Sequence, residues 1–501
     1  MHLSLTFTKM KKLNNMAQYR AFYISDGANP NYLASIHKVT EVFDIDGADN
    51  IKRIVIDGRD VVVGKSVGVG SVVVYFPPES VICENFLKAN SLYNLHNYQK
   101  NVNARYVENE LYLAENATDE ETKKMHLLKA RSCCGFFEAN GRVKTRKIKG
   151  IYSMGFAMNV GSIVAMDSVF SVCDWDNLVG MRFDVANGEK VCWKYVNKAP
   201  VEYTRTPNKF YNKTMRKLFA KNSHLIDGQF RLHYDTEALS NVMGTLNPYA
   251  FVEVTVKFDG AAGCVSNVLV NKDLNVFQKL AKRLGFNVKD KDYHVIYASH
   301  RVVKNVEINP LVTEGFYNVD IWKPVYDVLK NHLNEGWSVY GEIVGYVNGT
   351  DKLIQPDRDY GCKPGEWKFM VYRITRTDAN GHVTEFAVSE IELWVNNLIR
   401  YNDVAKKHII PPVKLYAGQL CKMYDIDPES SDWAEKFLEA MANDTDRLGM
   451  ELDEPLCEIP GPREGVVVRY DNVGYKFKSK RHYLLESERA DKGYINIEDN
   501  N

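Results

Sequence analysis

Short alternating segments separated by glycine turns constrain the fold of this 501-residue chain more than any other feature. The segments are rich in Val, Ile and Tyr and lie at 32–39, 51–56, 60–64 and 70–76. Glycine-bearing turns separate them, so successive segments are too close in sequence for parallel crossovers. The pattern predicts a small antiparallel barrel of the OB-fold kind.

The chain changes character near residue 250. From there, segments rich in β-branched residues alternate with stretches of helical periodicity at 271–284, 320–335, 389–407 and 431–449. Ser389 to Glu392 fits a capping box at the start of the third helix. The predicted fold class is therefore α+β, with an OB-like β-barrel followed by a domain of antiparallel sheets and helices.

Composition shifts give expected boundaries. We expect an OB domain at 19–155 and a larger domain at 225–485, joined by a connection at 156–224. The larger domain is expected to carry a helical insert at 387–460. Residues 1–18 and 486–501 are expected to be tails, and the polar stretch 94–130 a surface insertion.

Charge and cysteine content limit the class of protein. Lys plus Arg and Asp plus Glu both number 64, so a polyanionic partner would have to be held by local clusters. The nine cysteines are odd in number and scattered, which is typical of a reducing compartment. No apolar run reaches the roughly 18 residues of a membrane span. We expect a soluble intracellular protein without a disulfide framework or a membrane partner.

A basic cluster occupies residues 142–149, where five of the eight residues are Lys or Arg. In an extended strand Arg142, Lys144 and Arg146 would point to one face. Such a stripe suits the phosphates of a nucleic acid. The alternative is a solvated edge strand that its lysines protect from aggregation.

A candidate nucleophile ends the segment 252–257. Three valines share one strand face, while Glu253, Thr255 and Lys257 share the other. Asp259 and Gly260 follow as a turn that reverses the chain. A turn flanked by lysine is common, so this segment alone decides nothing.

Further segments follow in order: 298–301, 340–345, 369–374, and an apparent hairpin of 464–469 with 475–478. Lys476 and Lys478 share one face of the last strand. A lysine, two glutamates (Glu342 and Glu464) and a pair of lysines in this order resemble the covalent nucleotidyltransferase superfamily of polynucleotide ligases and mRNA capping enzymes. The second domain would then be an ATP-grasp-like nucleotidyltransferase domain.

The resemblance implies roles for these residues. Lys257 would attack the α-phosphate of ATP, which requires an unprotonated amine, and the nearby Lys476 and Lys478 together with desolvation would lower its pKa. Glu464 and Glu342 would hold Mg²⁺ or Mn²⁺, or the ribose. The other expected contacts to the nucleotide are Phe369, stacked on the base, Arg301 at the sugar or strand end, and Glu253, Thr255, Asp259 and Gly260 beside the nucleophile.

Two departures select among members of the superfamily. Only 23 residues follow Lys478, too few for the OB domain that DNA ligases and capping enzymes place there, so the barrel is expected to precede the catalytic domain. Ala262 stands where capping enzymes usually have arginine. An OB module that precedes the catalytic domain resembles the RNA ligases of the Deinococcus type and their phage relatives.

Two features differ from those RNA ligases. One is the insert 387–460, and the other is Arg373, where the family usually has an acidic residue.

The resemblance therefore implies an ATP-dependent RNA ligase that joins 3′-hydroxyl and 5′-phosphate ends through a lysyl-AMP intermediate. The expected substrate is a break in an RNA or RNA/DNA duplex with RNA on the 3′-hydroxyl side. A monomer in the cytoplasm is expected, or in the host cytoplasm if the chain is viral. The alternatives are an ATP-dependent DNA ligase and a nucleic-acid-binding protein with a degenerate transferase domain.

Overall fold

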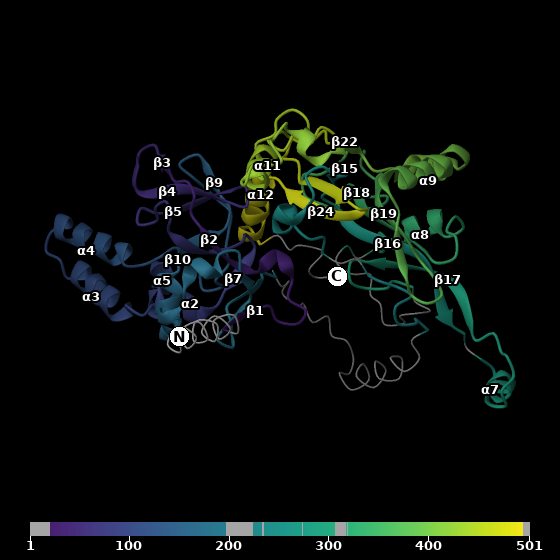
Figure 1. Ribbon diagram of the computed structural model, residues 1–501, viewed down its shortest axis with the longest axis horizontal. Helices are drawn as coiled ribbons and strands as arrows, with labels where there is room; N and C mark the ends of the chain where they lie inside the picture. Colours follow the sequence, from purple (N-terminus) through teal and green to yellow (C-terminus); the bar gives the residue numbers. More distant parts are fainter. Residues whose placement is uncertain are drawn as a thin grey trace, which may run out of the picture.

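The computed structural model describes residues 21–196, 224–232, 235–272, 274–305, 317 and 319–493. It is a mixed α/β structure with several antiparallel sheets. In Figure 1 the amino-terminal half, purple to blue, lies beside a carboxy-terminal half drawn teal to yellow.

The amino-terminal half contains the four strands predicted from residues 32–76. Its larger sheet has the order β10-β6-β2-β11, with β2 at Ala34–Lys38, β6 at Val72–Phe76, β10 at Phe156–Asn159 and β11 at Arg182–Phe183. A second sheet consists of β3 (Phe43–Ile45), β4 (Ala48–Ile56) and β5 (Arg59–Gly64). Across the strands that the structure describes, the pairings close no barrel, so the expected OB-like barrel is not shown.

Smaller elements complete this half. The strands are β1 (Phe22–Tyr23), β7 (Ser80–Ile82), β8 (Arg146–Ile148), β9 (Ile151–Ser153), β12 (Val185–Ala186), β13 (Glu189–Lys190) and β14 (Cys192–Lys194). The helices are α2 (Glu84–Ala89), α3 (Ala104–Glu115), α4 (Glu120–Ser132) and α5 (Gly161–Met166), with short 3-10 turns η1 (Pro30–Tyr32), η2 (Leu95–Lys100), η3 (Ser168–Val172) and η4 (Trp175–Leu178). The expected surface insertion at 94–130 is thus largely the helical pair α3 and α4.

The expected connection at 156–224 is wrong in its first part. Strand β10 pairs with β6, β11 with β2, and β14 with β7, so the chain up to Lys194 belongs to the amino-terminal half. Residues 197–223 lie outside the described part of the chain.

Two sheets form the carboxy-terminal half. The smaller has the order β22-β15-β23-β24, with β15 at Phe251–Lys257, β22 at Lys414–Gln419, β23 at Gly465–Tyr470 and β24 at Val473–Lys478. The six-stranded sheet contains β16 (Ala261–Asn271), β17 (Lys291–Ser299), β18 (Trp337–Gly345), β19 (Trp367–Thr377), β20 (Val383–Glu385) and β21 (Ile409–Ile410). The turn at 258–260 carries the chain from the first sheet directly into the second.

The carboxy-terminal half also contains helices. They are α7 (Val276–Arg283), α8 (Lys323–Leu329), α9 (Val388–Tyr401), α10 (Asp403–His408), α11 (Trp433–Ala442) and α12 (Lys480–Asp491), with 3-10 turns η5 (Leu239–Asn241), η6 (Met243–Thr245) and η7 (Leu420–Met423). The helices α8 and α9 pack on the larger sheet around one apolar core, and α11 packs on the smaller sheet around another. Each expected helical stretch overlaps a helix: the stretch 389–407 is two helices, α9 and α10, and α7, α8 and α11 are shorter than expected.

Three expectations about the carboxy-terminal part need correction. The helix α9 begins at Val388, and the Glu390 carboxylate accepts a hydrogen bond from the Ala387 amide at 2.8 Å, so Ser389 and Glu392 are not its capping pair. The insert 387–460 also contributes β22, which pairs with β15 and is part of the sheet. Of the expected tail 486–501, residues 486–491 are the second half of α12, and residues 494–501 lie outside the described part of the chain.

Contacts between the halves hold them together. The Arg59 guanidinium donates to the Ser240 hydroxyl at 2.9 Å, and both side chains are buried. Gly58 faces α11, where a Cβ would lie 2.3 Å from the Leu438 Cβ, so only glycine fits. Residues of both halves can therefore line one cavity.

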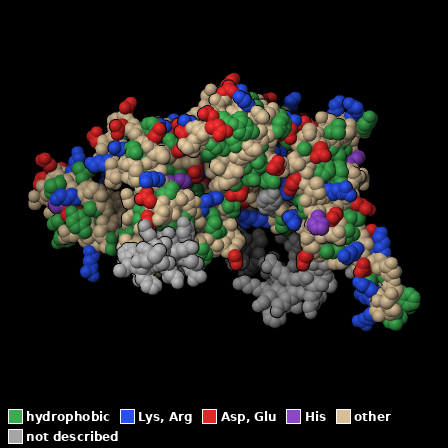
Figure 2. Space-filling model, viewed as in Figure 1, with side chains coloured by type: hydrophobic (Ala, Val, Ile, Leu, Met, Phe, Trp, Pro, Cys, Tyr) green, Lys and Arg blue, Asp and Glu red, His purple; other side chains and the backbone are tan. Residues whose placement is uncertain are grey.

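The hairpin β16–β17 projects away from the body and carries α7 at its tip (Figure 1). Apolar and basic side chains are exposed there (Figure 2), including Phe277 at 83%. Among the described helices, none is long and apolar enough to cross a membrane.

Candidate active site

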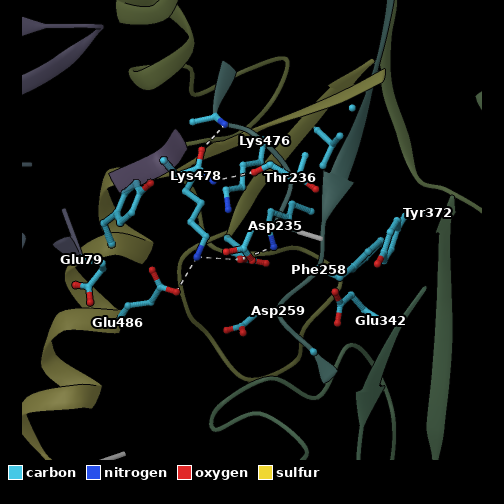
Figure 3. Close-up of a pocket in the computed structure, with 18 of the residues that line it drawn as sticks. Glu79, Asp235, Thr236, Phe258, Asp259, Glu342, Tyr372, Lys476, Lys478 and Glu486 are labelled. Carbon is cyan, nitrogen blue, oxygen red and sulfur yellow. Dashed lines mark hydrogen bonds and ion pairs between the residues drawn. The ribbon is translucent and has the colours of Figure 1, made fainter. Parts of the chain in front are cut away.

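A pocket of about 410 Å³ lies between the two halves of the molecule. Strands β15, β23 and β24 and the 258–260 turn form one wall. The opposite wall combines α12 with loops of the amino-terminal half (Figure 3). Lining residues from this second wall include Tyr32, Glu79, Arg142 and Lys194.

The alternation of β15 places Lys257 in this pocket. Val252, Val254 and Val256 are buried in the apolar core, so the opposite face carries Thr255 and Lys257 into the pocket. The Lys257 Nζ lies 2.7 Å from the Glu464 Oε1. Glu253, on the same face, pairs with Lys414 at 3.0 Å and is not among the lining residues.

Several basic side chains lie around Glu464. Its Oε1 lies 3.4 Å from the Lys478 Nζ and 3.9 Å from the His482 Nε2, in addition to its contact with Lys257. Its Oε2 is buried and has no hydrogen-bond partner among the described residues. The next residue is Gly465, where a Cβ would meet the Phe477 carbonyl oxygen at 2.2 Å, so glycine is needed for β23 to pack on β24.

The two lysines of β24 point into the pocket as their spacing predicts. Phe477 between them is buried in the core, while Lys476 and Lys478 line the pocket. The Lys478 Nζ also lies 2.7 Å from the Glu486 Oε1 (Figure 3). Burial alone would lower the pKa of Lys478, but the carboxylates of Glu486 and Glu464 raise it well above its usual value. This lysine is therefore a fixed positive charge.

Asp259 lies in the turn after Lys257, between two arginines. Its Oδ2 is 3.2 Å from the Arg489 Nη1 and 3.6 Å from the Arg358 Nε. Burial would raise the pKa of Asp259, but His482, Arg489 and Arg358 lower it. At Gly260, a Cβ would lie 2.6 Å from the Ile343 carbonyl oxygen, so the tight turn requires glycine.

Glu342 and Tyr372 form the opposite end of the pocket (Figure 3). Glu342 is a buried residue of β18. In β19, Val371 pairs with Gly341 and Arg373 with Tyr340, so Tyr372 is the extra residue of a β-bulge. The bulge turns the Tyr372 side chain to the pocket.

Phe369 does not lie in the pocket, contrary to the expectation that it stacks on a base. It is fully buried in the core of the larger sheet, against Gly341 and Gly263. Tyr372, three residues later, is the aromatic that the sequence interpretation missed. A bulge has no clear sequence signature, so strand alternation could not identify it.

The basic residues 142–146 do not form one exposed face. Residues 142–145 precede β8, and the Arg142 side chain is 2% exposed, donating to the Glu79 Oε2 at 3.0 and 2.7 Å. The Lys144 Nζ pairs with Glu138 at 2.8 Å and with Asp491 at 2.7 Å. Arg146 is exposed. Binding of nucleic acid by these three residues stays a prediction.

Arg301 is exposed at the end of β17 and is not among the lining residues, so its expected contact to the nucleotide stays a prediction. The structure adds Asp235 to the pocket. Burial would raise the pKa of Asp235, but Lys194, Lys476 and His300 lower it strongly. The structure also adds Tyr483, Glu486 and Arg489 from α12. Ser479, whose side chain accepts from the His482 amide, is the one local signal that a helix starts there.

No cluster of three or more His, Cys, Asp or Glu side chains suited to a metal ion occurs in the described part of the chain. Glu342 and Glu464 are thus separate single carboxylates in one pocket.

No family model matches the sequence, and no curated protein matches it. Solved structures of a Naegleria gruberi RNA ligase are similar in fold. The ligase with PPi has a TM-score of 0.49 and 17% identity, covering 92% of this chain and 99% of that chain. A mutant of it with ATP and Mn has a TM-score of 0.49 and 16% identity, covering 91% and 99%. Similarity this low assigns no role to any residue of this chain, so residue roles rest on the geometry of the pocket.

Proposed function

We propose that the protein is an ATP-dependent RNA ligase that forms a covalent lysyl-AMP intermediate at Lys257. The observation that carries the proposal is the contact of the Lys257 Nζ with Glu464 in a pocket that also presents Lys476 and Lys478. A lysine amine, fixed cations and single carboxylates in one cavity are the groups that transfer of a nucleotidyl group requires.

In the first step, the Lys257 amine attacks the α-phosphorus of ATP. A P–N bond forms, the bond to the β-phosphate oxygen breaks, and pyrophosphate leaves. The amine must lose its proton first, yet the Glu464 carboxylate at 2.7 Å favours the protonated form. A divalent cation bound to Glu464 would weaken this contact and favour transfer of the proton from Lys257 to solvent.

Glu464 and Glu342 are the residues that would hold Mg²⁺ or Mn²⁺. Mg²⁺ commonly binds to one or two protein carboxylates together with substrate phosphates and water, so a larger cluster is not required. The buried Oε2 of Glu464, which lacks a hydrogen-bond partner among the described residues, fits this use. A bound divalent ion would offset charge on the phosphoryl oxygens and on Glu464.

The remaining lining residues suit the other parts of ATP. Lys476 and Lys478 would contact the phosphates, and Tyr372 would stack on the base, with Glu342 near the ribose. Thr255, Asp259 and Gly260 border the nucleophile. Tyr372 replaces Phe369 in this proposal because Phe369 is buried in the core.

AMP then passes from Lys257 to a 5′-phosphate, forming a phosphoanhydride as the P–N bond breaks. A 3′-hydroxyl attacks that 5′-phosphate and AMP leaves. We propose a nick with RNA on the 3′-hydroxyl side as the substrate, and a platform for it on the amino-terminal half, as in RNA ligases of the Deinococcus type and their phage relatives. The position of the pocket between the halves supports access of a strand from the amino-terminal side.

The test is incubation of the full chain with α-labelled ATP and Mg²⁺ or Mn²⁺, then denaturing electrophoresis and peptide mapping. We expect acid-labile label on Lys257, and its loss in Lys257→Ala and in Lys257→Arg, because a guanidinium stays protonated. Lys279→Ala, in the exposed helix α7, is the matched control and should label normally. Label on another lysine, or label retained in Lys257→Ala, would contradict the proposal.

Substrate class is tested separately with three nicked duplexes: all DNA, all RNA, and DNA with one ribonucleotide at the 3′-hydroxyl end. We expect sealing of the last two and little sealing of the first. Equal sealing of all three would indicate a DNA ligase.

A further inference from the structure

The helix α12 lies where the two halves of the molecule meet. It follows β24 directly, so it begins two residues after Lys478, and it packs beside β8 and β9 of the amino-terminal half. Side chains three or four residues apart share a face of a helix. Two of its faces therefore contact different halves of the molecule.

The pocket face of α12 contacts two residues of the proposed active site. Glu486 accepts from the Lys478 Nζ at 2.7 Å, and Arg489 donates to the Asp259 Oδ2 at 3.2 Å. Arg489 also donates to the Pro356 carbonyl oxygen. One helix thus fixes a catalytic cation and the turn that follows the nucleophile.

The other face of α12 is anchored to the amino-terminal half. The Ser487 hydroxyl accepts from the Thr145 amide at 3.1 Å and donates to Glu79 at 3.1 Å, and Ser487 is 3% exposed. The Asp491 carboxylate lies 2.7 Å from the Lys144 Nζ and 3.8 Å from Arg142. Apart from Glu79, these anchors come from the segment 142–145.

We propose that Glu486 and Arg489 are positioning residues for the reaction at Lys257, and that the amino-terminal half holds them in place through Ser487 and Asp491. This inference rests on the proposed function, which it deepens. None of the four residues needs to touch the nucleotide.

The Lys478 ammonium is held between two carboxylates, at 2.7 Å from Glu486 and 3.4 Å from Glu464. Without Glu486, its nearest remaining partner is Glu464, which also binds Lys257. Lys478 would then shift toward Glu464 and away from the phosphates. Because electrostatic catalysis depends on charges that are already in position, the loss should appear in the rate of the chemical step.

The same argument applies to Arg489. Its removal leaves Asp259 with Arg358 as its remaining arginine contact among the described residues. Lysine at position 489 keeps the charge but cannot donate to Asp259 and the Pro356 carbonyl in the same forked geometry.

The experiment measures single-turnover labelling of Lys257 at varied ATP concentration. For Glu486→Gln we expect a rate constant at saturating ATP roughly 10- to 100-fold below wild type, with the half-saturating ATP concentration changed less than about threefold. Glu486→Asp should recover part of the rate. Asp491→Asn, which contacts only the amino-terminal half, should slow the same step by a smaller factor.

Glu488→Gln makes the same chemical change on the solvent face of α12 and should label as wild type. Arg481→Lys, whose partner is Asp453, is the control for Arg489→Lys. A wild-type rate constant in Glu486→Gln would overturn the inference and leave the proposed function intact. Absence of label in the wild-type chain would instead overturn the proposed function. A melting temperature lowered equally in the Gln and Asp variants, without recovery of rate, would show that Glu486 only stabilises the fold.

Discussion

The two walls of the pocket present cations in different ways. On the strand wall, Lys257, Lys476 and Lys478 occupy alternate positions of β15 and β24 and all line the cavity. On the opposite wall, Arg142 and Lys144 are also two residues apart, but they precede β8 and are buried in ion pairs. Both reach Asp491, so they do share a side, but that side is packed against α12. Alternation in sequence therefore predicts which side chains share a side and not whether that side is open to a ligand.

This difference separates two kinds of charge. The strand-wall lysines line the cavity, and Lys478 keeps its charge because two carboxylates surround it. The charges of Arg142 and Lys144 are matched by Glu79, Glu138 and Asp491. In the proposed function the first group acts on the nucleotide, whereas the second group contacts α12 through Asp491.

The largest expected effect is on the strand wall. Lys478→Ala should slow labelling of Lys257 by roughly 100-fold or more, because it removes one fixed charge aimed at the phosphates. Lys476→Ala and Glu464→Ala should also lose roughly two orders of magnitude. Lys480→Ala, two residues further on and paired with Glu451, is the control. Near wild-type rates in all three variants, with unchanged melting, would mean that the strand wall is not a catalytic surface.

The opposite wall gives a sharper test of the comparison. If Arg142 and Lys144 belonged to a solvent-exposed stripe that binds nucleic acid, Arg142→Ala and Lys144→Ala would leave labelling of Lys257 unchanged. If they anchor α12, both changes would slow that labelling. We expect each to slow labelling by roughly tenfold, and Arg142→Ala to lower the melting temperature, since it leaves Glu79 without its buried partner. Arg146→Ala should leave labelling unchanged. We expect Arg146→Ala to weaken binding of a nucleic-acid strand instead, which can be measured at two salt concentrations.

Phe369 and Tyr372 of β19 provide a smaller contrast. Phe369→Ala should destabilise the protein by about 3 to 5 kcal/mol, the usual cost of removing a buried aromatic side chain. Tyr372→Ala should leave the melting temperature nearly unchanged and raise the half-saturating ATP concentration several-fold. Thermal melting and labelling of both variants check this. The reverse result would restore Phe369 as the base contact.

Much of the strand wall could be predicted from the sequence because it depends on local rules. The valines of β15 and Phe477 of β24 fix which face is buried, so the directions of Lys257, Lys476 and Lys478 follow. The rest depends on long-range packing. The bulge at Tyr372 arises from the register in which β18 and β19 pair, and the partners of α12 in the amino-terminal half are far away in sequence.

The smallest expected effect is a pH dependence at the junction of the two walls. The arginines and His482 hold the pKa of Asp259 below its usual value, against the opposing effect of burial. A carboxyl whose pKa is lowered by folding stabilises the folded state above its unfolded pKa of about 3.9. That stabilisation is lost as the pH falls from there through the lower folded pKa. The melting temperature of the wild type should therefore exceed that of Asp259→Asn at pH 5 to 7, and the difference should shrink below about pH 4. Asp471→Asn, in an exposed turn, should show a much smaller pH-dependent difference. A difference that grows as the pH falls would mean that Asp259 is held in its protonated form, and that Arg489 does not pair with it as an ion.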